Sequence, residues 1–377
     1  MSKNPVIIVP ALGQSKLYIT DANGNKIKNV WPFELDEKAL LEEMKGSLMK
    51  MMLFRTDGGF SDKVAGIVDE ITAPFALDEN GENVNTIKTA LSSSCYAECN
   101  ENEQEFIKKV YPVDGLVAEL GADKIFYFEY NFFGDVFSNA KSLYELIAEV
   151  KAKTGSEKVD FIVMSTGAAV FKAWIKQNSA EPVAGKVVFV TAFLDGASAV
   201  ADIYEGKINL ENPAALLTSM GGKAASLAQV VGMLPADVIE NVISKSINVL
   251  RKNILNNCSS LWALIPVNRF DSILSKQKMT TDLWAKVSEI KCYTERIREN
   301  FKALEEKGVK FAFVCGKGRH LPEIFASADV DCDGIVDVSS ASLGGAFEEN
   351  TLYVDSLEHI GAVKNEEVIS FVEKFLA

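Results

Sequence analysis

One serine in this sequence stands where an expected strand turns directly into an expected helix. Ser165 follows the apolar run 158–164 and is followed by three small residues, Thr166, Gly167 and Ala168. A serine on such a turn projects its hydroxyl above the edge of a sheet, beside N–H groups that begin a helix. Acyl transfer needs this combination of an accessible nucleophile and N–H donors aimed at the developing oxyanion. The pattern makes Ser165 a candidate nucleophile.

The segment matches the Gly-x-Ser-x-Gly nucleophile motif only in part. Gly167 fills the second glycine position, whereas Val163 fills the first. Because matches this short have a high false-positive rate, a buried structural serine at an ordinary turn is the competing interpretation. The assignment therefore depends on whether the chain also supplies a base, an acid and a second oxyanion donor.

Histidine is the usual base for a serine nucleophile near neutral pH, and the chain contains two. His359 lies after the last expected strand and before the last expected helix. His320 lies in a loop after an earlier strand, where a solvated histidine is the commoner outcome. The sequence favours His359 as the base.

Strand-like and helical segments alternate around these residues. Short apolar runs indicate strands, and apolar positions at helical spacing indicate helices. Strands are expected at 5–9, 125–128, 158–164, 186–191, 309–314 and 351–354, and helices at 139–152, 278–307 and 365–376. This alternation predicts an α/β protein with a mostly parallel, doubly wound sheet and right-handed crossovers.

An acidic segment, 329–334, follows one of these strands and reads Asp-Val-Asp-Cys-Asp-Gly. The order serine, acid, histidine is that of α/β-hydrolases. Asp333 is the preferred acid because Gly334 allows a tight turn that presents the carboxylate to an imidazole. Asp331 is the alternative.

The same segment begins like an EF-hand calcium loop. Its twelfth position is Ser340 instead of a bidentate glutamate, and no convincing helix precedes it. Calcium binding is therefore the less favoured interpretation. The six cysteines and two histidines form no zinc pattern. Neither a metal nor an organic cofactor is expected.

The turn-rich loop 10–15 follows the first expected strand and offers the second oxyanion donor. In hydrolases of this type, one N–H comes from such a loop and the other from the residue after the nucleophile. The amides of Leu12 and Thr166 are the predicted donors, although the loop also fits a plain strand exit.

Two stretches interrupt the alternation and are predicted to be insertions. The expected core comprises residues 1–33, 124–198 and 308–377, with a first cap at 34–123 and a second, helical cap with a return helix at 199–307. The methionine-rich run 49–54 is an adaptable apolar surface that could cover an acyl-binding cleft or make peripheral membrane contact. Packing against neighbouring elements is the favoured interpretation.

Charge and composition limit the classes of partner and the cell compartment that we expect. The net charge of −13 repels phosphate backbones, so nucleic acid is not an expected partner. No stretch approaches the roughly 20 apolar residues of a membrane span, and the N-terminal residues carry no signal-peptide pattern. With scattered cysteines of the reduced type, these features predict a cytoplasmic protein.

Six segments, in order along the chain, resemble the lecithin:cholesterol acyltransferase-like branch of the α/β-hydrolases. They are residues 9–17, 30–32, 111–116, 130–140, 159–168, and 331–340 taken with 358–361. The resemblance implies an α/β-hydrolase fold with helical caps that shape an acyl-chain pocket. It also implies Ser165 as nucleophile, Asp333 as orienting acid, His359 as base, and an oxyanion hole from the Leu12 and Thr166 amides.

The chain departs from that family at three places: Val163, residues 131–133, where Asp-Trp-Arg is usual, and residues 191–196, where Thr-Pro-x-x-Gly is common. The expected activity is that of a serine hydrolase of the lipase, phospholipase or esterase type. Its substrate would be a lipid or another small-molecule ester, and acyl transfer to an alcohol is a variant. The alternative is a catalytically degenerate hydrolase that binds a lipid or a protein.

Overall fold

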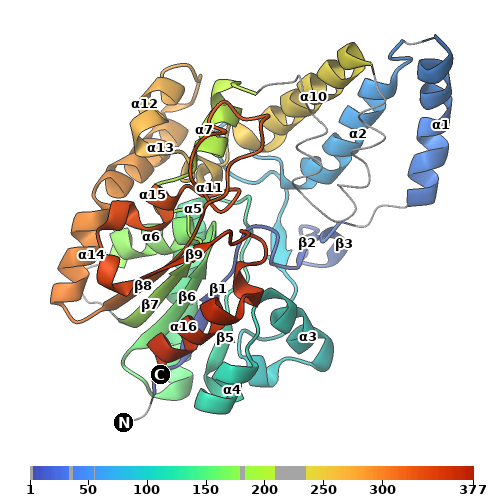
Figure 1. The fold of residues 1–377 in the computed structure, drawn as a ribbon. Coiled ribbons are helices and arrows are strands. Elements are labelled where there is room, and N and C mark those ends of the chain that lie inside the picture. The colour runs from blue at the N-terminus through green and yellow to red at the C-terminus, as the bar shows by residue number, and fades with distance from the viewer. Residues whose placement is uncertain (1–2, 34–36, 55, 179–182, 209–234) are drawn as a thin grey trace.

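A six-stranded parallel sheet forms the centre of the molecule (Figure 1). The computed structural model describes residues 3–33, 37–54, 56–178, 183–208 and 235–377. The strands are β1 (Val6–Val9), β5 (Ile125–Tyr127), β6 (Val159–Met164), β7 (Ala184–Val190), β8 (Lys310–Lys317) and β9 (Thr351–Asp355), in the spatial order β5-β1-β6-β7-β8-β9. β1 and β6 are buried along their whole length, as strands inside a helix-covered parallel sheet must be.

Two buried apolar clusters lie on opposite faces of this sheet. Ile7 and Val9 belong to one cluster, and Val6 and Ile8 belong to the other, as the period-2 alternation of a strand requires. The first face is covered by α5 (Val136–Thr154), α6 (Gly167–Asn178), α13 (Thr281–Glu295) and α14 (Ile297–Glu306). The second face is covered by α3 (Glu101–Val110), α4 (Asp114–Leu120) and α16 (Glu366–Leu376).

Further elements lie outside these layers. A small antiparallel sheet contains β2 (Leu17–Thr20), β3 (Lys26–Trp31) and β4 (Ile87–Thr89). Other helices of the described chain are α1 (Glu37–Phe54), α2 (Phe60–Thr72), α7 (Ser198–Glu205), α10 (Ala236–Leu250), α11 (Ser259–Trp262), α12 (Val267–Leu274) and α15 (Val338–Ala341). Phe60 of α2 and Val238 of α10 share a separate buried cluster, so the two predicted insertions contact one another.

The expected strands agree closely with the observed ones, whereas two helices differ. The helix expected at 139–152 begins at Val136, because the Asp135 carboxylate accepts a hydrogen bond from the Ser138 amide and caps the helix earlier. The return helix expected at 278–307 is two helices that meet at Arg296.

The methionine-rich run forms the last part of α1. The expectation that it packs against its neighbours is wrong for Met49, Leu53 and Phe54, whose side chains are all more than half exposed in the described part of the chain. α1 instead contacts α2 through residues nearer its middle, such as the half-buried Met44. None of the described helices is long and apolar enough to cross a bilayer.

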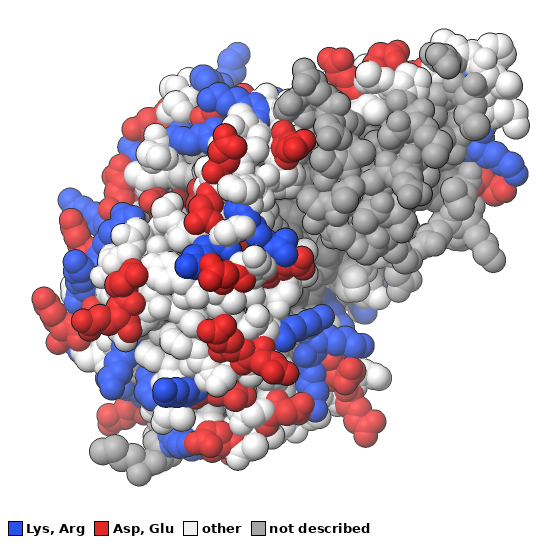
Figure 2. All heavy atoms as spheres, viewed as in Figure 1, with Lys and Arg blue, Asp and Glu red and all other residues white. Residues whose placement is uncertain are grey.

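Acidic and basic side chains lie among one another over the core in Figure 2. On this face the described acidic side chains are interspersed with basic ones and form no single acidic patch.

The order of the sheet and its connections define the fold. Ser165 follows β6 and leads into α6, the acidic segment follows β8, and His359 follows β9. Because the strands are parallel, all three segments leave the sheet at one edge. This is the α/β-hydrolase fold predicted from the sequence.

Candidate active site

Ser165 occupies a tight turn between β6 and α6. Its φ angle is 49°, in the left-handed region that non-glycine residues rarely adopt, at a typical cost of about 1–3 kcal/mol. Three backbone hydrogen bonds hold the turn: the Ser165 amide donates to the Val190 carbonyl at 3.0 Å, and the Ser165 carbonyl accepts from the amides of Ala168 and Phe193, each at 3.2 Å. The strained backbone fixes the direction of the Ser165 side chain.

Gly167 lets the start of α6 approach the end of β1. A Cβ atom at this position would lie 2.6 Å from the Pro10 carbonyl oxygen and 2.9 Å from the Val9 carbonyl oxygen. Val163, in contrast, is fully buried and pairs with Val9 and Phe189 in neighbouring strands. The atoms nearest to a Cβ at Gly167 therefore belong to Val9 and Pro10, at the end of β1 and just beyond it, and a glycine at 163 is not needed to make room for Gly167.

Three side chains from distant parts of the chain meet above this sheet edge. The Ser165 Oγ lies 2.8 Å from the His359 Nε2, and the His359 Nδ1 lies 2.7 Å from the Asp333 Oδ2. All three are largely withdrawn from solvent, with side-chain exposures of 11% for His359 and 1% for Asp333. The structure thus brings together the predicted nucleophile, base and acid in one continuous hydrogen-bonded line.

The Asp333 carboxylate is fixed by its own backbone. Its Oδ1 accepts hydrogen bonds from the amides of Ile335 at 3.0 Å and Val336 at 2.8 Å, which leaves Oδ2 for the imidazole. Gly334, at φ +95°, makes the intervening turn. The Asp333 carbonyl also accepts from the His359 amide at 3.1 Å, so the two loops are joined by main chain as well as by side chain.

The alternative candidates lie elsewhere. The Asp331 carboxylate accepts from the Gly318 amide at 2.6 Å, and the His320 side chain is exposed. Asp331 and Asp333 therefore serve different partners. Across the described residues, no group of three or more His, Cys, Asp or Glu side chains is arranged to hold a metal ion.

Gly316, near the end of β8, lies between the two loops that carry the acid and the base. A Cβ added there would lie 2.6 Å from the Asp333 Cβ and 3.0 Å from the Leu357 Cβ. Only a residue without a side chain lets these loops close on each other, and no motif in the sequence marks this glycine.

Phe193 packs its ring against the imidazole. The two ring centroids are 6.0 Å apart and the planes are nearly perpendicular, at 80°. Phe193 is buried and belongs to the segment 191–196 that departs from the family pattern. The departure marks the residue in the sequence, but its contact with His359 becomes evident only in the structure.

The two residues predicted to supply the oxyanion donors contact each other, but the amide of one of them is already hydrogen-bonded. The Leu12 amide donates to the Thr166 Oγ1 at 2.7 Å. Thr166 stands just before the first residue of α6, where backbone N–H groups have no partner within the helix. The sequence identified both residues by their amides and missed the Thr166 hydroxyl.

Buried polar contacts anchor the acid loop to the second predicted cap. The fully buried Asp202 of α7 pairs with Arg269 of α12 at 2.6 Å and accepts from the Ser327 amide at 2.8 Å. The Ser198 hydroxyl donates to the Asp337 carboxylate at 2.6 Å. These contacts hold the segment around Asp333 against α7 and α12.

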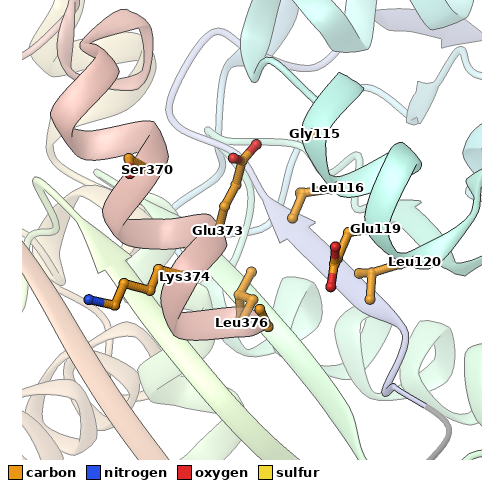
Figure 3. A pocket seen from close by; sticks show the side chains of 9 residues that line it. Gly115, Leu116, Glu119, Leu120, Ser370, Glu373, Lys374 and Leu376 are labelled. Carbon is orange, nitrogen blue, oxygen red and sulfur yellow. The ribbon is translucent and has the colours of Figure 1, made fainter.

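A crevice of about 300 Å³ between α4 and α16 is not part of this site (Figure 3). Leu376, which lines it, accepts a hydrogen bond through its carbonyl from Lys186 at the start of β7. Glu119, which also lines it, pairs with Lys3 before β1. Both contacts mark the edge where the strands begin, which is opposite to the edge that carries Ser165.

No protein-family model matches the chain, and no curated protein matches it. Similar solved structures include the Tle4–Tli4 complex, at 12% identity with 99% of this chain and 98% of that chain covered and a TM-score of 0.40. The mature lipase BlEst2 of Bacillus licheniformis has 12% identity, coverage of 72% and 86%, and a TM-score of 0.35. A bromoperoxidase from Bacillus anthracis has 11% identity, coverage of 82% and 87%, and a TM-score of 0.29. Similarities at this level assign neither a family nor an activity.

Proposed function

We propose that this chain is a serine hydrolase of carboxylic esters, with Ser165 as nucleophile, His359 as general base and Asp333 as the acid that orients the imidazole. The observation that carries the proposal is the line of two short hydrogen bonds, 2.8 Å and 2.7 Å, that joins these side chains. A serine hydroxyl that is bonded to a carboxylate-paired imidazole at a strained turn is the arrangement that activates serine for acyl transfer.

The proposed reaction begins when the Ser165 oxygen attacks the ester carbonyl carbon. His359 Nε2 takes the hydroxyl proton, and the Asp333 carboxylate stabilises the imidazolium through Nδ1. The tetrahedral oxyanion is held by the amide of Thr166 and by that of Leu12. His359 then returns the proton to the departing alcohol, which leaves an acyl-enzyme on Ser165.

Deacylation uses the same base. His359 removes a proton from water, which attacks the acyl carbon, and the proton passes to Ser165 as the acid product leaves. An alcohol in place of water would give acyl transfer. The resemblance to the lecithin:cholesterol acyltransferase-like branch supports a lipid ester or another small ester as substrate, with hydrolysis as the favoured outcome.

A fluorophosphonate reagent tests the activation of the serine. We expect labelling of wild-type Ser165 and none in Ser165→Ala, and we expect His359→Ala to lose nearly all labelling. Hydrolysis of p-nitrophenyl esters of increasing acyl length, compared between the wild type and His359→Ala, then reports the acyl preference. A wild-type chain that neither reacts with the reagent nor hydrolyses any ester of the series contradicts the proposal.

A catalytically degenerate hydrolase that binds a lipid or a protein is the second candidate. The bond between the Leu12 amide and the Thr166 hydroxyl favours it, because that amide is not free to hold an oxyanion in this conformation. Co-sedimentation with phosphatidylcholine vesicles by a chain that does not react with fluorophosphonate would support this candidate.

A further inference from the structure

The Thr166 hydroxyl lies where a reacting oxygen is expected. Donors of an oxyanion hole lie about 2.7–3.1 Å from the oxyanion that they stabilise. The Leu12 nitrogen is 2.7 Å from the Thr166 Oγ1, and this oxygen accepts its hydrogen. The Thr166 hydroxyl oxygen therefore occupies the position, relative to the Leu12 amide, that the oxyanion of a substrate would occupy.

We propose that the Thr166 side chain is a self-inhibitory plug, which fills the oxyanion position of Leu12 in the free enzyme and must rotate away before the carbonyl oxygen of an ester can bind there. The inference rests on the proposed function, since it concerns the rate at which the same site reacts. It assigns a role to the Thr166 side chain that is separate from the role of the Thr166 amide.

The loop that carries Leu12 is held on both sides of this residue. The Tyr130 hydroxyl donates to the Pro10 carbonyl at 2.9 Å, and the Trp31 indole nitrogen donates to the Gly13 carbonyl at 2.6 Å. A buried tyrosine and a half-buried tryptophan thus hold the carbonyls on both sides of Leu12. We therefore expect the oxyanion hole to open without a movement of this loop. Rotation of one threonine side chain is the smaller change.

The backbone keeps the Leu12 amide and the Thr166 hydroxyl close to each other. Gly167 lies against the Pro10 carbonyl, with room for no side chain, and this contact brings the residue before it to the Leu12 loop. Ser165 cannot shift to relieve the contact, because its own turn is held by bonds to Val190 and Phe193. The plug is therefore built into the same turn that presents the nucleophile.

Two substitutions separate the hydroxyl from the rest of the residue. Thr166→Ala keeps the backbone amide and removes the plug, whereas Thr166→Ser restores a hydroxyl on the same amide. A hydrogen bond of ordinary net strength corresponds to about a 2- to 10-fold change in an equilibrium. We therefore expect kcat/KM for p-nitrophenyl butyrate, and the rate of Ser165 labelling by a fluorophosphonate, to rise about 2- to 10-fold in Thr166→Ala and to fall back toward the wild-type value in Thr166→Ser.

A second measurement does not depend on activity. Hydrogen exchange of the Leu12 amide, followed by NMR, should be slow in the wild type and in Thr166→Ser, and at least several-fold faster in Thr166→Ala. Equal exchange in all three forms would overturn the plug. So would a Thr166→Ala rate that is unchanged, or one that falls while Thr166→Ser retains the rate, since the latter pattern means that the hydroxyl donates to the oxyanion.

The two proposals fail differently. If Ser165 reacts in no form of the protein, the proposed function is wrong, while the exchange of the Leu12 amide still decides whether the hydroxyl holds it. If Ser165 reacts in every form at one rate, the function stands and the plug is refuted.

Discussion

Gly316 and Asp333 lie in direct contact, so closely that a methyl group on Gly316 would stand 2.6 Å from the Asp333 Cβ. Real Cβ atoms do not approach that closely, and the same methyl group would lie 3.0 Å from the Leu357 Cβ and 3.2 Å from the Leu357 carbonyl oxygen. Because residue 316 of β8 has no side chain, the loop that carries the acid and the loop that carries the base can lie this close to each other.

Gly316→Ala should separate these loops. We expect the Asp333–His359 contact to open, kcat for ester hydrolysis to fall by at least about 100-fold, since misplacement by about 1 Å costs that much, and the melting temperature to drop. Gly66→Ala is the matched control, because its added methyl group meets nothing within 4 Å and α2 should gain up to about 1 kcal/mol. A Gly316→Ala variant as active and stable as Gly66→Ala would contradict this account.

Asp333→Asn should remove the charge that stabilises the imidazolium while it keeps the shape of the side chain. The expected loss in kcat is about 10⁴-fold, as for the equivalent change in a serine protease. Asp331→Asn is the comparison, because Asp331 binds the Gly318 amide and not the imidazole. Stopped-flow measurement of p-nitrophenolate release checks both variants, and similar losses in the two would argue against Asp333 as the acid.

Lys172 should make the stability of the protein depend on pH. Its ammonium group is fully buried in α6 and donates to the Leu194 carbonyl at 2.9 Å, and burial lowers its pKa from 10.5 to about 8. Between these values the unfolded chain binds more protons at this site than the folded chain does. Stability therefore rises with pH across this window, by about 3 kcal/mol in total.

Urea unfolding of the wild type and Lys172→Met between pH 7.5 and pH 10 measures this contribution. The free energy of unfolding of the wild type should increase relative to that of the variant as the pH rises above 8. If the difference between the two free energies stays constant over the range, the group does not titrate in the folded protein as stated.

Arg269→Met should strongly weaken the attachment of the acid loop to the second predicted cap. It leaves the carboxylate of Asp202 buried and without its cation, a change that typically costs about 3–5 kcal/mol. Lys291→Met is the control, since Lys291 pairs with the exposed Asp271 carboxylate and its loss should cost less than about 1 kcal/mol. Denaturant midpoints measured side by side test the contrast, which fails if both variants lose the same amount.

The meeting of Ser165, Asp333 and His359 could be predicted from the topology of the sheet and from the small number of histidines in the chain. Apolar runs indicated which segments are parallel strands, and parallel strands deliver the residues that follow them to one edge. With two histidines in the chain, only His359 stood after the final strand.

Other features could not be predicted, since they depend on the approach of segments that are remote in sequence. The partner of the Leu12 amide and the space around Gly316 are set by distances of a few tenths of an ångström between loops. Val163 illustrates the same limit. A short motif requires glycine there, but the crowding at Gly167 comes from the carbonyls of Val9 and Pro10.

The position of β1 inside the sheet has a consequence for biosynthesis. β1 leaves the ribosome before both of its neighbours, β5 and β6, which begin only at Ile125 and Val159. Its four apolar residues therefore stay unpaired in the nascent chain until the residues of β5, which begins at Ile125, have been synthesised.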